Sequence, residues 1–535
     1  MAHKGSYLIG VDVGTGSARA GVFNLAGEML AMARQDIRLW RDGVSAEQSS
    51  DDIWHAVCAA VREAIAKSGV RSEKVAGLGF DATCSLVVLG HGGKPLAVGE
   101  SEDPNRNVIV WMDHRAVEQS ELINTQKHPV LKYVGGRISP EMETPKLLWL
   151  KQHRPKIFDA AWQFFDLADF LTWKATGDLA RSTCTVTCKW TYLAHEDRWD
   201  PSYFHAIGLG NLADEAFARI GQRAVAPGTP LGRGLTAEAA NDLGLTEGAP
   251  VAAGLIDAHA GGIGTVGVGG DPTANLGYVF GTSSCTMTTT TKPVFVPGIW
   301  GPYYSAMVPG MWLNEGGQSA AGAAIEQLLQ LHPAAHRIKQ QAAGVGLSLG
   351  NYLADCAQAS AGSNDPVSLA RGLHVVPDFL GNRAPFADPF SRAVICGLGM
   401  ESDVEELIAL YVAGLCGIGY GLKQIIEAQA QSGINVENVV VSGGAGQHSL
   451  VRQVLADAAG KAIVTTRCAE PVLLGAAILG AVAGGCFSDI RSAMAKLSSM
   501  ESMVAPAAGA IARIHAERYK GFKLLQGQER ALRGV

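Results

Sequence analysis

One strand–turn–strand pattern occurs twice in this chain, about half its length apart. The first copy is "VDVGTGSARAGVF", residues 11–23, and the second is "NLGYVFGTSSCTMTTTT", residues 275–291. In each copy a run of apolar and β-branched residues meets a turn of glycine and hydroxyl residues, and a second such run follows. This order predicts a β-hairpin. Two such hairpins facing each other would hold one polyphosphate from both sides, so the pattern predicts a duplicated α/β fold with a nucleotide between its halves.

The first turn offers backbone N–H groups with little steric obstruction and two hydroxyls, which suits a phosphate; its residues are Gly14, Thr15, Gly16 and Ser17. Asp12, at the end of the preceding strand, is placed to hold Mg²⁺ through water. A dinucleotide fingerprint would need glycine where Arg19 stands and a helix after the turn. A Walker loop would need Gly-Lys-Ser/Thr, which the chain lacks. A plain hairpin whose Asp and hydroxyls cap the turn stays open as an alternative.

A third glycine site follows a predicted strand near the C-terminus. Residues 436–441 are mostly apolar and β-branched, and Gly443, Gly444 and Gly446 then open a predicted helix. Glycines at a strand-to-helix turn let a flat ring or a phosphate lie against the backbone. Simple helix packing is the alternative explanation.

The stretch "VAAGLIDAHAGG" contains the carboxylate best suited to proton transfer. Residues 251–256 resemble a buried strand, and Asp257 stands where a helix begins. Phosphoryl transfer to a hydroxyl needs a carboxylate that accepts the proton. Aspartate at a helix start also commonly accepts helix N–H bonds. The residues alone leave both roles open for Asp257.

Length and composition narrow the class of protein. The chain has 535 residues, too many for one core, and a formal net charge of −6, which argues against nucleic-acid or anionic-membrane partners. Its ten cysteines form no disulfide framework, and the closest pair, Cys184 and Cys188, lacks a histidine cluster for zinc. The N-terminus shows no secretory signal pattern, so reduced thiols in the cytoplasm are expected. The longest apolar run, 472–487, predicts a buried helix that another backbone approaches closely.

Eight stretches in a fixed order carry a family resemblance. They are "GVDVGTGSARA", "GLGFDATCSLVVL", "VIVWMDHRA", "PKLLWLKQ", "GLIDAHAGGIG", "FGTSS", "NEGGQSAAG" and "VSGGAG". Together they resemble the FGGY family of carbohydrate kinases, within the actin–hexokinase–chaperone ATPase superfamily, and most of all its D-ribulokinase-like subgroup. One position departs from the family signature, which has a small or hydroxyl residue where Glu143 stands, three residues before Lys146.

The resemblance implies two ribonuclease-H-like α/β domains with the active site in the cleft between them. We expect an N-terminal domain over residues 1–267, a C-terminal domain over 268–487, and a helical extension over 488–535 packed on the C-terminal domain. The implied activity is ATP-dependent phosphorylation of a ketopentose, D-ribulose first, with Mg²⁺ as the metal. The expected partners are the sugar and ATP, without nucleic acid or membrane, and a homodimer stays open.

The resemblance also assigns roles to particular residues. It implies Asp257 as general base and Asp12 as the residue near the metal. It implies contacts with ATP from Gly14, Thr15, Gly16, Ser17, Gly281, Thr282, Ser283, Gly322, Gly443, Gly444 and His448. It implies contacts with the sugar from Asp81, Thr83, Trp111, Asp113, His114, Lys189, Asp257, Glu315 and Gln318. For the sugar residues, surface ion pairing in "WMDHR" and a solvated face of the β-rich run around Lys189 are the alternatives.

Other substrates and one other class of protein compete with this interpretation. Ribitol, L-ribulose, D-xylulose and glycerol are alternative acceptors, although glycerol kinases have Arg-Glu where Thr83 and Cys84 stand. A chaperone or filament ATPase of the same superfamily would have no sugar site, and the stretches "DATCS", "WMDHR" and "NEGGQS" argue against it. A sugar-sensing pseudokinase is disfavoured because both aspartates, 12 and 257, and both phosphate turns are present.

Overall fold

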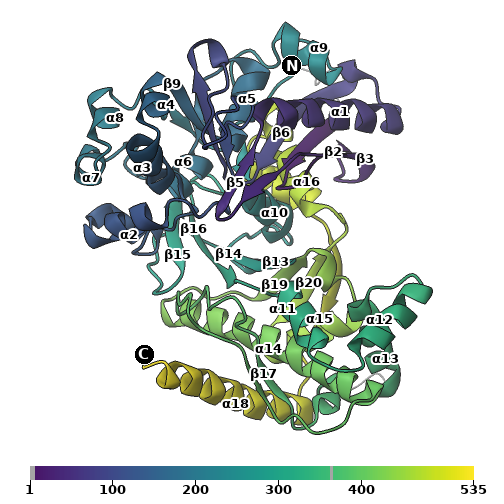
Figure 1. The fold of residues 1–535 in the computed structure, drawn as a ribbon. Helices are drawn as coiled ribbons and strands as arrows, with labels where there is room; N and C mark the ends of the chain where they lie inside the picture. The colour runs from purple at the N-terminus through teal and green to yellow at the C-terminus, as the bar shows by residue number, and fades with distance from the viewer. Residues whose placement is uncertain (1–5, 362–364, 535) are drawn as a thin grey trace.

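Two β-sheets, one in each half of the chain, organise the computed structural model, which describes residues 6–361 and 365–534 (Figure 1). The N-terminal half lies above the C-terminal half in Figure 1. A five-stranded sheet belongs to the first half and a seven-stranded sheet to the second.

The N-terminal sheet has the strand order β12-β6-β1-β2-β3. Its strands are β1 (Tyr7–Val13), β2 (Ser17–Asn24), β3 (Met29–Asp36), β6 (Val75–Ala82) and β12 (Leu255–Ile256). The first three strands form an antiparallel meander that contains the first predicted hairpin, and β6 and β12 continue the sheet in parallel with β1.

The C-terminal sheet repeats this topology and adds one strand at each edge. Its order is β15-β16-β14-β13-β19-β20-β21, in which β13, β14 and β16 are antiparallel and β19 and β20 run parallel to β13. The bounds are β13 (Asn275–Phe280), β14 (Ser284–Thr290), β15 (Trp300–Tyr304), β16 (Trp312–Gln318), β19 (Asn438–Ser442), β20 (Ala462–Thr466) and β21 (Met500–Val504). The repeated hairpin of the sequence is therefore the start of a repeated sheet.

A second five-stranded sheet, ordered β4-β5-β8-β7-β9, extends the N-terminal half beside the cleft. Its strands are β4 (Trp40–Asp42), β5 (Ser45–Gln48), β7 (Leu86–Gly90), β8 (Val108–Ile109) and β9 (Ala161–Asp166). The loop after β8 carries the "WMDHR" residues, so this sheet places that loop next to the first phosphate turn.

The outer faces of both main sheets are covered by amphipathic helices. In the N-terminal half α1 (Ser50–Ser68) packs on β2 and β3. In the C-terminal half α14 (Val404–Gln431) packs against α11 (Gly322–Gln330) and α15 (Ser449–Ala459). Among the described residues α14 is the one helix long and apolar enough to cross a membrane, but 83% of its most apolar window is buried inside the protein. It is therefore a core helix of this domain.

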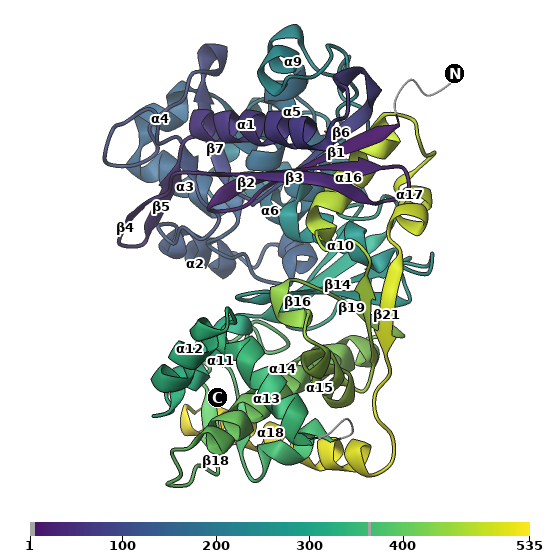
Figure 2. The same cartoon turned by 90° about the vertical axis from the view of Figure 1, so that its right-hand side faces the viewer.

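Two helices, α10 (Asp257–Val266) and α16 (Pro471–Ala483), pack against each other between the main sheets (Figure 2). Glycines allow backbone-to-backbone contact here. A Cβ atom on Gly475 would lie 1.9 Å from the carbonyl oxygen of Ala260, and one on Gly10 of β1 would lie 2.0 Å from that of Leu473. The prediction of a buried helix that another backbone approaches closely is confirmed. Because α16 packs on β1 and β6, it joins the C-terminal part of the chain to the N-terminal sheet.

Two local predictions of secondary structure need correction. The β-rich run around Lys189 is a helix, α6 (Thr183–Trp190), whose first turn is capped by Ser182. The threonines and valine of this run are buried on all sides, so tertiary packing overrides their β-propensity. The predicted strand 251–256 is reduced to the two residues of β12, with isolated bridges at Val251 and Ala252.

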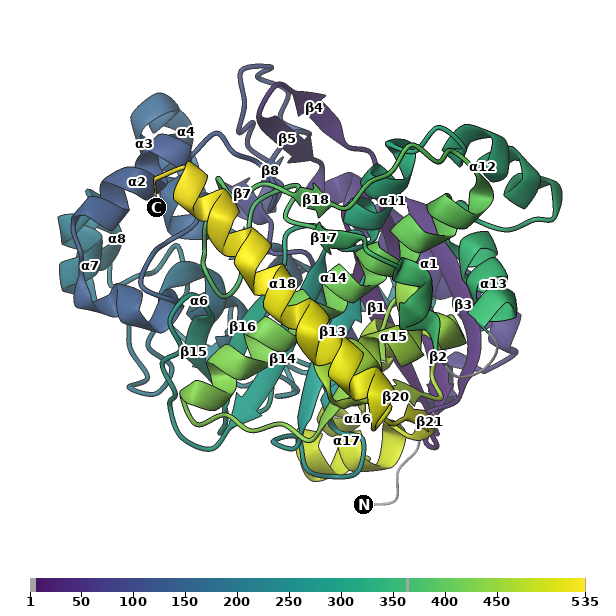
Figure 3. The ribbon, with the colours of Figure 1, turned by 90° about the horizontal axis from the view of Figure 1, so that it is seen from below.

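The C-terminal segment is only partly helical. Its first helix, α17 (Ile490–Leu497), packs on α16 and α10, and β21 then adds an antiparallel strand to β20. The last helix, α18 (Ala510–Leu532), runs across the lower face of the C-terminal half, against α14 and α15 (Figure 3). The predicted terminal helix is present, while strand β21 was not expected.

The contact between α16 and α10 predicts a position that tolerates no added methyl group. Gly475→Ala forces the two helices apart, and overpacking of this kind typically costs about 1–3 kcal/mol. Gly527→Ala in α18, where an added Cβ meets nothing within 4 Å, serves as the matched control. It should raise stability by about 0.4–1 kcal/mol. Thermal and denaturant unfolding of both variants measure the effects, and equal stability of the two variants would contradict the packing argument.

Candidate active site

Each of the two predicted phosphate turns is closed by an internal backbone hydrogen bond, which spans three residues in the first turn and two in the second. The N–H of Gly14 donates to the carbonyl of Ser17 at 3.0 Å, and the N–H of Gly281 donates to that of Ser283 at 3.0 Å. Helix α11 begins on the second turn, where the N–H of Gly322 donates to the carbonyl of Gly281 at 2.9 Å. A Cβ on Gly322 would lie 2.8 Å from that same carbonyl oxygen, so the helix start needs glycine. An anion at this turn would also meet the N-terminus of α11.

Two residues outside the first turn form hydrogen bonds with it. One is Trp111 of the "WMDHR" region, and the other is Gln48 of strand β5. The indole N–H of Trp111 donates to the hydroxyl oxygen of Thr15 at 3.0 Å. The side-chain amide of Gln48 donates to the carbonyl of Thr15 at 2.7 Å. Trp111, predicted as a sugar residue, is thus directly linked to the predicted phosphate turn. Gln48 has no distinguishing pattern in the sequence and was not predicted.

Three carboxylates meet at the carboxyl ends of adjacent parallel strands. Asp12 of β1 pairs in register with Asp81 of β6, and Asp257 directly follows β12, the next strand along. Asp12 is 2% exposed and Asp81 is fully buried. Parallel topology therefore brings together three acids that lie far apart in the sequence.

The acids differ in their partners. Oδ2 of Asp12 accepts a hydrogen bond of 2.7 Å from Arg19, which also donates to Glu470 at 2.7 Å. Within residues 6–361 and 365–534, neither carboxylate oxygen of Asp81 has a hydrogen-bond partner. Burial, followed by the charge of Asp12, raises the pKa of Asp81 well above its ordinary value. The three aspartates therefore include carboxylate oxygens without hydrogen-bond partners, and they carry more negative charge than Arg19 balances.

Asp257 is the first residue of α10, one position inside the cap. Its Oδ1 accepts the N–H of Ala258 at 2.7 Å. Burial, followed by the nearby charge of Asp12, raises the pKa of Asp257 to about 6. A carboxylate of this kind is ionised near neutral pH and is more basic than an ordinary aspartate, as general-base catalysis requires.

A second group of polar residues contains Lys189, whose charge affects the pKa of Asp257. Lys189, at the end of α6, and Glu315, on β16, are 9% and 6% exposed. The ammonium of Lys189 lies 5.9 Å from the ring centre of Trp300, and the guanidinium of Arg383 lies 5.5 Å from the same ring. Burial would lower the pKa of Lys189, but the neighbouring Cys84 and Glu315 outweigh it and raise that pKa, so the lysine stays charged. Trp300 and Arg383 were not predicted.

Two predicted sugar residues are engaged elsewhere. Asp113 is fully buried, and its oxygens accept hydrogen bonds from the backbone of Ala46 and from Arg115, which leaves its carboxylate a supporting role. The amide of Gln318 accepts from Tyr278 and Ser284 and donates to the carbonyl of Ile418. Because it points into the C-terminal domain towards α14, Gln318 does not share the face of β16 that carries Glu315.

The other predicted residues lie nearer the cleft. Thr83 follows β6 and shares a hydrogen bond of 3.1 Å with Ser85. His114 has a half-exposed side chain, and Glu141, whose Oε1 lies 4.0 Å from its Nε2, raises its pKa. The unexpected Glu143 is fully buried and lies 3.3 Å from the ammonium of Lys146, so an ion pair accommodates this departure from the family signature.

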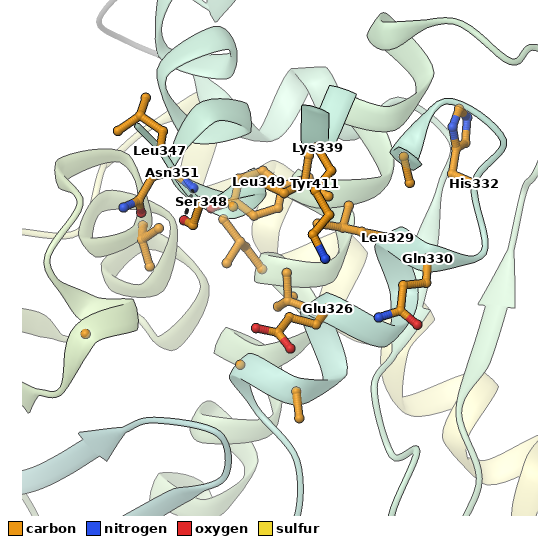
Figure 4. A pocket seen from close by; sticks show the side chains of 18 of the residues that line it. Glu326, Leu329, Gln330, His332, Lys339, Leu347, Ser348, Leu349, Asn351 and Tyr411 are labelled. Carbon is orange, nitrogen blue, oxygen red and sulfur yellow. Dashed lines mark hydrogen bonds between the residues drawn. The ribbon is translucent and has the colours of Figure 1, made fainter. Parts of the chain in front are cut away.

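A pocket of roughly 980 Å³ opens beside the second phosphate turn (Figure 4). Three of the predicted glycines, Gly281, Gly322 and Gly444, line it together with Thr282. Its remaining wall is apolar with a few polar groups, and it includes Ile325, Glu326, Leu329, Lys339, Leu347, Ser348, Asn351, Tyr411, Leu415 and Val451. Size, lining and the adjacent turn fit a nucleotide.

Two further predicted nucleotide residues border this region. Gly443 has a φ of 94°, and a Cβ there would lie 2.4 Å from the carbonyl oxygen of Phe280, so the close approach of β19 to β13 requires glycine. His448 caps α15 and pairs with Asp355 at 3.0 Å. It is absent from the pocket lining, so the structure gives it a capping role.

Comparison with known proteins identifies the class to which this fold and site belong. The N-terminal domain model of the FGGY family of carbohydrate kinases matches residues 7–264, and the C-terminal domain model matches residues 276–484. The chain therefore belongs to the FGGY family, and it is an ATP-dependent sugar kinase with the two-domain actin-like fold.

Individual relatives agree with this assignment. A human FGGY carbohydrate kinase domain-containing protein is 46% identical, with 94% of this chain and 92% of the relative covered. A D-ribulokinase of Saccharomyces cerevisiae is 38% identical, with 91% and 73% covered. The solved xylulose kinase of Rhodospirillum rubrum superposes with a TM-score of 0.81 at 20% identity, with 98% and 99% covered.

The contact between Trp111 and Thr15 leads to a prediction about ATP. Trp111→Phe keeps the ring but removes the hydrogen bond that holds the first phosphate turn. A net hydrogen bond contributes about 0.5–1.5 kcal/mol, so kcat/KM for ATP should fall about two- to twelvefold. Trp199→Phe is the matched control, since its indole donates to Gly221 far from the cleft. Trp199→Phe should lower the melting temperature and leave kcat/KM for ATP unchanged. If both variants have the same kcat/KM for ATP, the proposed link between Trp111 and ATP binding at the first turn is refuted.

Proposed function

We propose that this sugar kinase phosphorylates D-ribulose to D-ribulose 5-phosphate. The observation that carries the proposal is Asp257, a carboxylate directly after β12 whose pKa is raised to about 6 by burial and by Asp12 and is affected in the opposite sense by Lys189. The choice of D-ribulose is supported by the 38% identical yeast D-ribulokinase and by the sequence stretches that resemble that subgroup. D-Xylulose is the second candidate, because the structural neighbours include xylulose kinases.

In the proposed reaction the two turns hold the phosphates of ATP, and Lys189 and Glu315 hold hydroxyls of the sugar. Asp257 accepts the proton of the attacking sugar hydroxyl while the hydroxyl oxygen forms a bond to the γ-phosphorus. ADP leaves with the electron pair of the broken bond between the γ-phosphorus and the bridging oxygen. Closure of the two halves would exclude water, which otherwise competes with the sugar as acceptor.

Mg²⁺ is proposed to accompany ATP. The residues present fit it, because Asp81 has two buried oxygens without partners and Asp12 lies beside it. Across the described ranges no three His, Cys, Asp or Glu side chains lie close enough to bind a metal directly, so water would complete the coordination. The ion would neutralise the negative charge of the ATP phosphates.

A cytoplasmic location for this protein stays a prediction.

A screen of acceptors tests the proposed substrate. ADP release is coupled to a detection enzyme and measured with D-ribulose, L-ribulose, D-xylulose, ribitol, glycerol and a heptulose. D-Ribulose should give the highest kcat/KM. A higher value with another sugar would replace the substrate, and nucleotide hydrolysis without any phosphorylated sugar would favour a non-kinase ATPase.

Asp257→Asn tests the general base. Asparagine keeps the size and can accept a hydrogen bond from the sugar hydroxyl, but it cannot take the proton. We expect kcat to fall about 10²–10⁴-fold, while the Kd values for ATP and sugar stay near those of the wild type. Isothermal titration, thermal melting and kcat on one preparation separate this result from unfolding. A folded variant with kcat within about threefold of wild type would exclude the role.

The pH profile gives an independent test of the same residue. The base must be ionised, and the pKa of Asp257 is raised to about 6. Hence kcat/KM for the sugar should fall as the pH drops through about 6, by about tenfold for each further unit. The residual activity of Asp257→Asn should not show this decrease of kcat/KM at low pH. A wild-type midpoint near the ordinary aspartate value, about 4, would show that the environment does not raise this pKa.

A further inference from the structure

His259, two residues after the proposed base, lies between Glu315 of the proposed sugar site and Cys184 of α6. It is 1% exposed. Its Nε2 lies 3.2 Å from Oε2 of Glu315, and its Nδ1 lies 3.1 Å from Sγ of Cys184. We propose that His259 is a positioning residue that fixes Glu315 relative to Lys189, and so determines the affinity for the sugar. This inference rests on the proposed function, in which Glu315 and Lys189 hold sugar hydroxyls.

Helix geometry separates the tasks of Asp257 and His259. Two positions along an α-helix are about 200° apart, so the two side chains leave α10 on nearly opposite sides. Asp257 has partial exposure towards the cleft, whereas His259 is enclosed by α6 and β16. The first turn of α10 thus carries Asp257, which is suited to accept a proton, and His259, which is suited to hold Glu315 in position.

The protein arranges acceptors on both sides of the ring. A carboxylate only accepts hydrogen bonds, so Nε2 must carry the proton that meets Glu315. On the other side Sγ of Cys184 already accepts the N–H of Ile256 at 3.4 Å. The ring therefore either donates to a thiolate or accepts from a thiol at Nδ1, and both arrangements leave the Nε2–H on Glu315.

Neighbouring charges favour the doubly protonated ring. Burial opposes ionisation of Cys184, but Cys188 and His259 outweigh it and lower the pKa of Cys184 to about 5. Burial likewise opposes ionisation of Glu315, yet His259 lowers the pKa of that carboxyl to about 2. The pKa of His259 is raised to about 10 against the effect of burial, by Cys184 first and then Glu315. A charged donor makes the stronger hydrogen bond to Glu315.

The two partners of His259 belong to different halves of the molecule. Cys184 is in the first turn of α6, which carries Lys189 at its other end. Glu315 is on β16 of the C-terminal sheet. The start of α6 is also fixed by Ser182, which donates to Gly254 at 2.7 Å. Through these contacts the imidazole sets the spacing between the elements that carry Lys189 and Glu315.

Two substitutions at this position test the positioning role. His259→Leu removes the donor to Glu315 and should raise KM for the accepted sugar about 10- to 100-fold, while KM for ATP changes less than about twofold. His259→Gln keeps an N–H donor of similar reach and should recover most of the sugar KM. His515→Leu is the matched control, because His515 is also buried, at 3% exposure, and its Nδ1 lies 2.9 Å from the hydroxyl of Tyr420. It should affect the melting temperature only.

The ring itself gives a readout that does not depend on the substrate. Long-range ¹H–¹⁵N NMR of the wild type, assigned with His259→Gln, should show a proton on Nε2 across neutral pH. A ring protonated only at Nδ1 would overturn the proposal, and so would equal losses of sugar and ATP affinity in His259→Leu without recovery in His259→Gln. If the wild type phosphorylates no pentulose, the proposed substrate fails, and the NMR result together with KM for whichever acceptor is used still decides the role of His259.

Discussion

The contact of α16 with the backbone of the N-terminal sheet and of α10 is the constraint on which the rest of the structure depends. Glycines on both sides remove the side chains that would keep these elements apart. Because α10 begins with Asp257 and packs against α16, this contact fixes where the carboxylate emerges. The position of Asp257, the proposed base, relative to Asp12 and Asp81 therefore follows from backbone packing.

Around that fixed point the site is assembled from strand ends of two similar sheets. Each sheet contributes one glycine-rich hairpin turn, and each half contributes one buried charged group, Lys189 from α6 and Glu315 from β16. A duplicated fold is suited to a reaction with two substrates, one of which carries a polyphosphate. Its two equivalent turns can approach that polyphosphate from two directions. The pocket whose size and lining fit a nucleotide is formed wholly by residues of the C-terminal half, beside the second turn.

The sequence predicted the parts of this arrangement that depend on local pattern. Hairpins, the glycine turns and Asp257 at a helix start are short-range features, and they were found from the residues alone. The helix that carries Lys189 was missed because its threonines and valine favour strands in isolation, and only burial on all sides makes it helical. Arg19, Gln48, Trp300, Arg383 and His259 were missed for a different reason: their partners lie far away in the sequence, at Glu470 in one case. Gln318 was misplaced because position along β16 did not reveal which face its side chain would occupy.

The late position of α16 in the chain has a consequence for synthesis on the ribosome. Domains generally fold as units, with the N-terminal one first, as the chain emerges. Here the glycines of β1 and β6 are exposed to solvent until residues 471–483 have been made, although these strands are among the first parts of the chain to appear. All five strands of the N-terminal sheet lie within residues 7–256, so the sheet lacks only its covering helix α16 during most of translation, and this last packing step coincides with the synthesis of the final part of the C-terminal half.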